Sequence, residues 1–260
     1  MIKTSSQSSF IIKLIVCILS LLIWVLYRLL FNSKDETSLN FDDCFRDRYL
    51  ISYIYPITRF LSQNLHIRDL FLITGSNSLD VLLLSYIAIY VKYGNSWTGI
   101  INLVLFYGFR GVFQNYITLS YYHTYLYTEP AFFSFFVPVF RSADFFWSGH
   151  CGITLIAALQ FRKWGYVKTF YIGLIISLWQ GFVMTSLRAH YSIDIIFGWL
   201  ISHYSFWWST YIGSLLDKKF NIFGCATQTK SYVELKALQV IRVNDNSEAE
   251  DYKNRSDLTV

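Results

Sequence analysis

The sequence is short of charge, proline and cysteine, and each shortage excludes a class of protein. Only 15% of its 260 residues are charged, against roughly 25% in a soluble domain, so the residues for a large solvated surface are missing. Three prolines and 13 glycines exclude a collagen-like or proline-rich chain. The four cysteines lie far apart without a C-x-x-C pair, so neither a zinc site nor a disulfide scaffold is indicated. The net charge of +5 comes without the basic stripe that nucleic-acid binding requires.

Hydrophobic residues are abundant instead, at 54% of the chain, and aromatic residues reach 20%. A membrane-spanning helix needs about 20 mostly apolar residues. We therefore predict an all-α polytopic membrane protein with six transmembrane helices. In the second span the strongly apolar part, 79–91, is too short to cross a membrane alone, so this span must extend back toward Asp69. The other predicted spans are 10–31, 99–120, 148–162, 166–187 and 190–212.

The chain divides into four predicted segments around these spans. Residues 1–31 hold the first anchor, whose apolar run is too long for a signal peptide and is followed by no small-residue cleavage site. Residues 32–69 are polar and form a lumenal loop or an amphipathic stretch on the membrane surface. Residues 70–213 are the membrane catalytic core with helices two to six, and 214–260 are a mostly disordered tail. Basic residues gather on the side of the termini, which the positive-inside rule assigns to the cytoplasm.

Two segments carry the residues of a catalytic site, one ending at His150 and the other beginning at Arg188. The first is Asp-Phe-Phe-Trp-Ser-Gly-His from Asp144, and the second is Arg-Ala-His-Tyr-Ser-Ile-Asp up to Asp194. The interval between them holds one span inward, a short basic turn and one span back. Both histidines are therefore expected at the N-terminal ends of inward-running helices, at the same non-cytoplasmic face.

The residues around these histidines suit a phosphate group. Helix N-termini present unpaired N–H groups and a partial positive charge, so they attract anions. Ser148 is a suitable N-cap, and Gly149 lets a phosphate come close to the backbone. Arg188 adds a planar fork of donors that matches phosphate oxygens. We therefore expect a phosphate-binding site at this face.

His190 and Asp194 stand four residues apart, which places them on one face of a helix. The carboxylate can hold one imidazole nitrogen as N–H and leave the other to attack, while His150 donates and later accepts a proton. An interfacial polar histidine, a structural cap or half of a metal site would give the same residue pattern. A metal is disfavoured because the remaining histidines lie elsewhere in the sequence, at His66, His123 and His203.

Both segments resemble motifs of a known superfamily. Ser148-Gly149-His150, followed by His190 to Asp194, resembles the second and third motifs of the lipid phosphatase and phosphotransferase (PAP2-like) superfamily. The closest resemblance is to its lipid phosphotransferase branch, with the sphingomyelin synthases and the plant phosphatidylcholine:diacylglycerol cholinephosphotransferases. The stretch from His190 to the aromatic triplet 206–208 resembles the sphingomyelin synthase motif. The features that look more like the plant enzymes are Asp144-Phe145-Phe146, Arg188, and Arg110-Gly111 with Gln114.

The resemblance, which covers about residues 100–210, implies roles for individual residues. His190 would be the nucleophile that forms a phosphohistidine, Asp194 its orienting partner and His150 the acid/base. The residues expected to bind the phosphate or headgroup are Ser148, Gly149, Arg188, Arg110 and Asp144. Neither a metal nor a cofactor is expected. The phosphatase branch has an arginine six residues before the nucleophile, where this chain has Met184, and this departure favours a transferase acting on a phosphodiester.

The resemblance thus predicts a membrane enzyme that moves phosphocholine from phosphatidylcholine to diacylglycerol. The expected partners are membrane lipids, and the expected place is the endoplasmic reticulum, or the Golgi, with a lumenal active site. The alternatives are transfer to ceramide, which would make sphingomyelin or ceramide phosphoethanolamine, and hydrolysis of a lipid phosphate. A non-enzymatic transporter or scramblase is a further alternative, although no repeat symmetry of the kind usual in transporters is evident.

Two features within the membrane region leave alternatives open. Arg110 lies near the centre of its span, and a charge there defaults to function: it pairs with Asp80 in a structural ion pair or lines the path to the headgroup. The ring-rich stretch 121–140 either anchors the chain at the membrane interface or, with Glu129 or Asp144, holds a quaternary ammonium by cation–π contacts.

Overall fold

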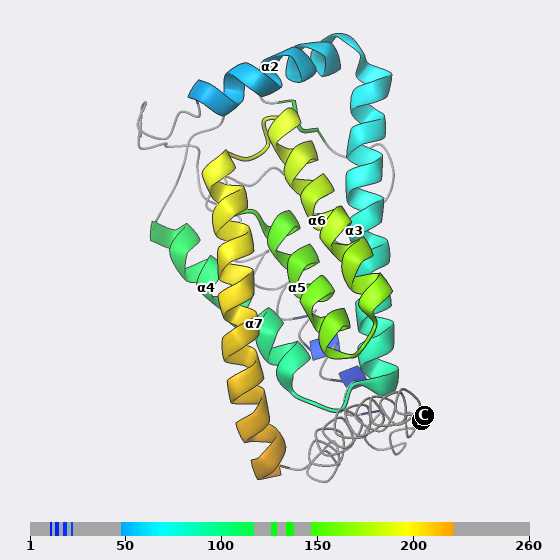
Figure 1. The fold of residues 1–260 in the computed structure, drawn as a ribbon, viewed down its shortest axis with the longest axis vertical. Coiled ribbons are helices and arrows are strands. Elements are labelled where there is room, and N and C mark those ends of the chain that lie inside the picture. The colour runs from blue at the N-terminus through cyan, green and yellow to red at the C-terminus, as the bar shows by residue number, and fades with distance from the viewer. Residues whose placement is uncertain are drawn as a thin grey trace, which may run out of the picture.

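The computed structural model describes residues 48–116, 126–128, 134–137 and 147–220, together with six isolated positions between residues 11 and 22. The regular secondary structure in these parts of the chain consists of helices, and they contain no strand (Figure 1), so the predicted all-α class is confirmed for them. The helices are α2 (Arg48–Gln63), α3 (Leu65–Tyr93), α4 (Thr98–Tyr116), α5 (Gly149–Lys163), α6 (Val167–Ser186) and α7 (Ser192–Phe220).

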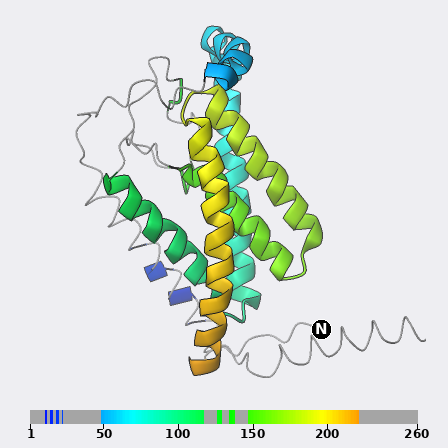
Figure 2. The same cartoon turned by 60° about the vertical axis from the view of Figure 1, so that its left-hand side comes forward.

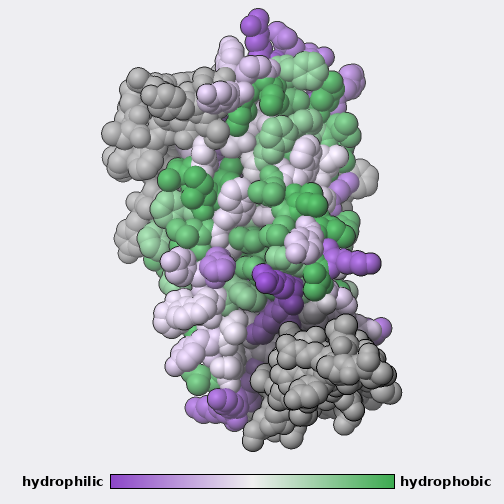
Figure 3. Space-filling view, viewed as in Figure 1, coloured by the Kyte–Doolittle hydropathy of each residue, from purple (hydrophilic) through white to green (hydrophobic). Residues whose placement is uncertain are grey.

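Two of the described helices, α3 and α6, are long and apolar enough to cross a membrane, and α4 contains a shorter apolar stretch, Thr98–Phe113. The outward face of α6 consists largely of large apolar side chains. Its exposed members are Tyr171, Ile172, Ile175, Leu178 and Phe182. Hydrophobic side chains cover much of the face that α6 and α3 present, and hydrophilic ones gather at the end formed by α2 (Figure 3). The six-span arrangement remains a prediction.

The segment 32–69 contains a helix that lies across one end of the bundle, α2 (Figure 1). Its inward face consists of Ile54, Ile57, Thr58 and Leu61, which recur at helical spacing and are less exposed than their neighbours. The Thr58 hydroxyl donates to the carbonyl of Ser186 at 3.0 Å, so α2 satisfies an acceptor at the C-terminal end of α6. The next helix begins at Leu65, so the predicted boundary at residue 69 falls inside α3. Residues 32–47 lie outside the described part.

Helix α5 is short and central, and it packs against α3, α6 and α7 (Figures 1 and 2). Small residues allow this close packing. A Cβ on Gly152 would lie 2.2 Å from the Phe106 ring of α4 and 2.8 Å from the Ser202 hydroxyl of α7. A Cβ on Gly173 of α6 would lie 2.8 Å from the Ala158 methyl group. The N-terminal end of α5 is therefore held between α4, α6 and α7.

Helices α3 and α4 meet at the turn that joins them. The hydroxyls of Tyr86 and Tyr90 donate to the carbonyls of Gly99 and Ser96, at 3.0 Å and 3.1 Å. Beyond this turn α4 leans away from α3, and it packs mainly on α7 (Figure 2). The Asp217 carboxylate of α7 holds the start of α4 by accepting from the amide of Trp97 at 3.0 Å.

Candidate active site

The first of the two predicted site segments ends at the start of α5, where Ser148 is the N-cap. Its side-chain oxygen accepts the amide of Cys151 at 3.4 Å, as the sequence indicates for this position. Trp147, directly before it, has a φ of 50°, a left-handed conformation that is a genuine outlier for a bulky residue. Its indole is buried and packs against the rings of Phe106 and Phe113. The packed indole therefore holds the strained backbone that leads into the N-cap.

The second segment begins with a Schellman turn at the C-terminal end of α6. The amide of Ala189 donates to the Met184 carbonyl at 2.8 Å, and the amide of Arg188 donates to the Thr185 carbonyl at 3.1 Å. Arg188 takes the left-handed position, with a φ of 53°, where glycine is usual. Its guanidinium lies over the Tyr55 ring of α2, 6.0 Å from the ring centroid. An arginine at this strained position suggests that its side chain is needed.

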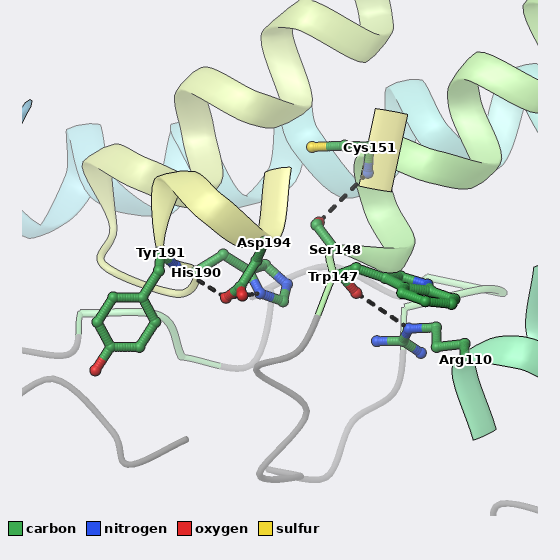
Figure 4. A network of polar contacts seen from close by, with 7 residues as sticks. All are labelled: Arg110, Trp147, Ser148, Cys151, His190, Tyr191 and Asp194. Carbon is green, nitrogen blue, oxygen red and sulfur yellow. Dashed lines mark hydrogen bonds and ion pairs between the residues drawn. The ribbon is translucent and has the colours of Figure 1, made fainter. Parts of the chain in front are cut away.

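His190 and Asp194 face each other at the start of α7. Nδ1 of His190 lies 3.5 Å from Oδ2 of Asp194, and both side chains are buried. The same carboxylate oxygen accepts the amide of Tyr191 at 3.0 Å, which is half of a capping box at the helix start. Because α7 begins at Ser192, His190 lies in the turn before the helix rather than on its face. The capping carboxylate thus turns back toward the imidazole (Figure 4).

The two histidines lie side by side. Their ring centroids are 6.1 Å apart, although 40 positions separate them in the sequence. The ring of Tyr127 lies 6.3 Å from that of His150. The amide of Leu126, its neighbour, donates to the Leu187 carbonyl at 3.0 Å. The segment 126–128 is thereby fastened across the end of α6 and puts an aromatic ring beside the pair.

Arg110 of α4 reaches the start of α5. Its Nε donates to the Trp147 carbonyl at 3.3 Å (Figure 4). A Cβ on Gly149 would lie 3.2 Å from its Cζ, so the guanidinium occupies the space that this glycine leaves. Asp80 does not pair with it, because that carboxylate accepts the amides of Phe135 and Phe136 at 2.8 Å and 3.1 Å. Of the two alternatives left open for Arg110, the ion pair with Asp80 is therefore not formed, since backbone amides satisfy the carboxylate.

The structure thus gathers most of the predicted site residues at one place. Those it brings together are Ser148, Gly149, His150, Arg110, His190 and Asp194. Arg188 lies two residues before His190 and leans toward α2. Asp144 and Glu129 lie outside the described residues. In the part of the chain that the structure describes, no three His, Cys, Asp or Glu side chains form a group that could hold a metal ion.

Two residues beside the site have no clear signal in the sequence. Tyr127 is one of many rings in the stretch 121–140, and nothing in that run distinguishes it. Trp147 contributes its backbone carbonyl to Arg110, a contact that residue type cannot predict.

Met184 stands at the position where the phosphatase branch has an arginine. It has a buried side chain and offers its carbonyl to the turn before His190. This position is therefore part of the core.

Comparison with protein families finds a match. The family model AtPDCT1/2, of the plant phosphatidylcholine:diacylglycerol cholinephosphotransferases, matches residues 53–206, more than half of the chain. That range contains both histidine segments and all the described site residues. No curated protein and no solved structure matches. The chain therefore belongs to the plant phosphatidylcholine:diacylglycerol cholinephosphotransferase family.

Proposed function

We propose that this protein transfers phosphocholine from phosphatidylcholine to diacylglycerol through a phosphohistidine on His190. The observation that carries the proposal is the pairing of His150 with His190, whose rings are 6.1 Å apart, inside a chain of this family. A carboxylate behind the nucleophile and an arginine beside the helix N-terminus complete the arrangement. Because the diacylglycerol that leaves and the diacylglycerol that accepts differ only in their acyl chains, the reaction exchanges headgroups between diacylglycerol species.

In the first half of the reaction, Nε2 of His190 attacks the phosphorus of phosphatidylcholine. The bond between phosphorus and the glycerol oxygen breaks, and protonated His150 gives its proton to that oxygen, so diacylglycerol leaves. Asp194 faces Nδ1 at 3.5 Å and stabilises the positive charge that the imidazole gains. The product on the enzyme is phosphocholine bound to His190, beside a neutral His150.

In the second half a new diacylglycerol enters with its free hydroxyl beside His150. The neutral imidazole takes the hydroxyl proton, the oxygen attacks phosphorus, and the bond from phosphorus to Nε2 breaks. Phosphatidylcholine is formed, and His150 is protonated again for the next turnover. The proton lost in one half returns in the other, so the cycle balances without an added acid or base.

The negative charge on the transferred group meets two positive features. The N-terminal end of α5, capped by Ser148, offers backbone N–H groups and a partial positive charge. Arg110 lies against Gly149 at that helix start and would supply charge-assisted hydrogen bonds. A phosphodiester carries one negative charge, and this set of donors fits it. Such positioning and charge complementarity carry most of phosphoryl-transfer catalysis.

In the proposed arrangement the chain crosses the membrane six times, and both of its termini lie in the cytoplasm. The site then lies toward the lumenal end, where α2 covers the bundle, and the membrane is that of the endoplasmic reticulum. The exposed apolar faces and the two helices long enough to cross support this arrangement. A tag at either terminus, probed for protease protection in sealed microsomes, tests it; a protected N-terminus would contradict the arrangement.

The activity is tested by expressing the full chain in a host that lacks such enzymes. Choline-labelled phosphatidylcholine is offered with unlabelled ceramide and with unlabelled diacylglycerol of a different acyl composition, and the labelled product species are followed. We expect exchange by the unmodified protein and none by His190→Ala. The matched control is His203→Ala, because His203 is an exposed histidine on α7, the helix that follows His190. Full exchange by His190→Ala, or labelling of ceramide in preference to diacylglycerol, would contradict the proposal.

The intermediate is tested separately. Labelled phosphatidylcholine is mixed with purified protein, and the reaction is quenched with alkali, in which the phosphorus–nitrogen bond of phosphohistidine survives. We expect protein-bound label in the unmodified chain and none in His190→Ala. Exchange kinetics should be of the ping-pong type. Intersecting kinetics without bound label would indicate direct transfer between the two lipids.

A further inference from the structure

A short non-helical segment, 134–137, lies against the middle of α3. Asp80 is 15 residues from the start and 13 from the end of that helix, so each end is about 20 Å away along its axis. Its carboxylate accepts the amides of Phe135 and Phe136, and the amide of Val137 turns back to the Ser134 hydroxyl at 3.2 Å. Non-helical backbone at membrane depth occurs only where protein buries it or it lines a cavity.

The segment has an inner and an outer side. Phe136 packs against a cluster of buried side chains from α3 and α5, and Val137 is buried. Phe135 points the other way and is 63% exposed. The segment therefore stands between the interior of the bundle and the surrounding lipid.

Helix packing closes three sides of the bundle near the site. Between α4 and α7, Phe106 lies where a Cβ on Gly152 would stand, next to Ser202. Between α6 and α7, the indole of Trp199 donates to the Ser177 hydroxyl at 3.0 Å. Between α3 and α6, the Gln180 amide donates to the Gly75 carbonyl at 2.6 Å.

The side between α3 and α4 is different, because the two helices diverge above their shared turn (Figure 2). There the contacts with Asp80 place the segment 134–137 against α3. Among the residues that the structure describes, the α3–α4 side is thus lined by a loop segment, where the other three sides are closed by helices.

This side is also next to the chemistry. Phe136 packs against the buried cluster that contains Ile153, and Tyr107 packs against the same cluster. Ile153 is three residues from His150, and Tyr107 is three residues from Arg110, so each lies about one helical turn, roughly 5 Å, from the site. A diacyl lipid with its hydroxyl at the site must extend its acyl chains into the hydrocarbon. The loop-lined side offers that direction.

We propose that Asp80 is a positioning residue that fixes the segment 134–137 as the wall along which the acyl chains of the lipid substrates lie. This inference rests on the proposed function and names the part of the protein that contacts the chains. A wall of this kind acts on long-chain lipids. A short-chain diacylglycerol reaches the site from the aqueous side and does not depend on it.

The kinetic test uses Asp80→Asn in the full-length protein. Asparagine keeps one acceptor but turns an amide NH₂ toward the second backbone N–H, so one hydrogen bond is lost. With dioleoylglycerol as acceptor we expect kcat/KM to fall about tenfold, the effect of one charge-assisted hydrogen bond. With dihexanoylglycerol it should stay within about twofold. The control is Asp69→Asn, which removes a half-exposed carboxylate of the same helix, paired with Arg68.

An equal fall with both acceptors, or no fall with either, would overturn the inference, because Asp80 would then be structural or idle. A second measurement does not need activity. Diacylglycerol with a diazirine in its acyl chain is photolysed with the unmodified protein, and the labelled peptides are mapped. We expect label on 134–137 or on the facing parts of α3 and α4. Label confined to other helices would refute the wall even in an active enzyme, whereas a lack of exchange in the unmodified protein refutes only the proposed reaction.

Discussion

The amide of Ser148 donates a 2.8 Å hydrogen bond to the carbonyl oxygen of Asp194. This bond joins the N-terminal ends of α5 and α7, the two helices that carry the histidine segments. Such close approach of two backbones needs a small residue on the facing helix. Gly198, one turn after Asp194 in α7, provides it, because a Cβ there would lie 2.7 Å from the Ser148 carbonyl oxygen.

The first prediction is that Gly198→Ala separates the two segments. The added methyl group meets backbone rather than a flexible side chain, so α5 or α7 must shift. We expect a loss of about 1–3 kcal/mol in stability, as overpacking usually costs, and a fall of about a hundredfold in exchange rate, because a shift of about 1 Å misaligns reacting groups. Thermal denaturation and headgroup exchange in the same detergent measure both.

Gly108→Ala is the matched control, since a Cβ at this position on α4 meets nothing within 4 Å. It should leave both stability and exchange near those of the unmodified protein. Normal exchange by Gly198→Ala would show that the distance between the helix starts does not govern the reaction.

The second prediction concerns the left-handed Arg188. Replacing it with glycine relieves the backbone, so Arg188→Gly should raise stability by about 1 kcal/mol. The same change removes the guanidinium, and exchange should fall at least about tenfold, as when a charge-assisted hydrogen bond is lost. Arg188→Lys keeps the strain and the charge and loses only the fork, so it should leave stability unchanged. A more stable Arg188→Gly with full exchange would show that the arginine serves no function at this site.

The third prediction separates the two roles of Asp194. Asp194→Asn keeps an oxygen that can accept the Tyr191 amide, so the cap survives and stability should change by less than about 1 kcal/mol. The negative charge that faces Nδ1 of His190 is lost, so a positive charge on the imidazole during the reaction is no longer stabilised. Exchange should fall by about a hundredfold or more. A large drop in melting temperature with little change in the rate per folded molecule would assign the residue to capping alone.

Sequence patterns predict those features that depend on one segment at a time. Apolar runs indicate the helices, and serine before Gly-His indicates the cap of α5. The spacing of one span in and one span back is sufficient to expect His150 and His190 at one face, and they lie side by side.

Features that depend on contacts between segments are not readable in this way. Asp80 and Arg110 carry opposite charges, so the sequence suggests that they form an ion pair. In the structure the Asp80 carboxylate instead accepts hydrogen bonds from backbone amides of the segment 134–137. A hydropathy pattern cannot place a loop segment beside the middle of a helix. The left-handed backbone of Trp147 and Arg188 is likewise invisible, because neither residue type favours it.

The last prediction concerns the contact between Arg110 and Gly149. Arg110→Lys keeps a charge but lacks the planar fork and the Nε that donates to Trp147, so exchange should fall by about a hundredfold. Gly149→Ala should act through the same group, because its methyl group would stand 3.2–3.4 Å from the guanidinium atoms and displace them. If so, the two changes are not additive.

The double variant decides between these possibilities. When Gly149→Ala works only by moving Arg110, the variant with both changes exchanges no more slowly than Arg110→Lys alone. If Gly149 serves instead to let the phosphate approach the backbone, the two losses multiply, to about ten-thousandfold when each is about a hundredfold. Exchange rates of the four proteins, each normalised to folded protein, give the coupling directly. A multiplicative result would assign the open space at Gly149 to the lipid phosphate and leave Arg110 with a separate role.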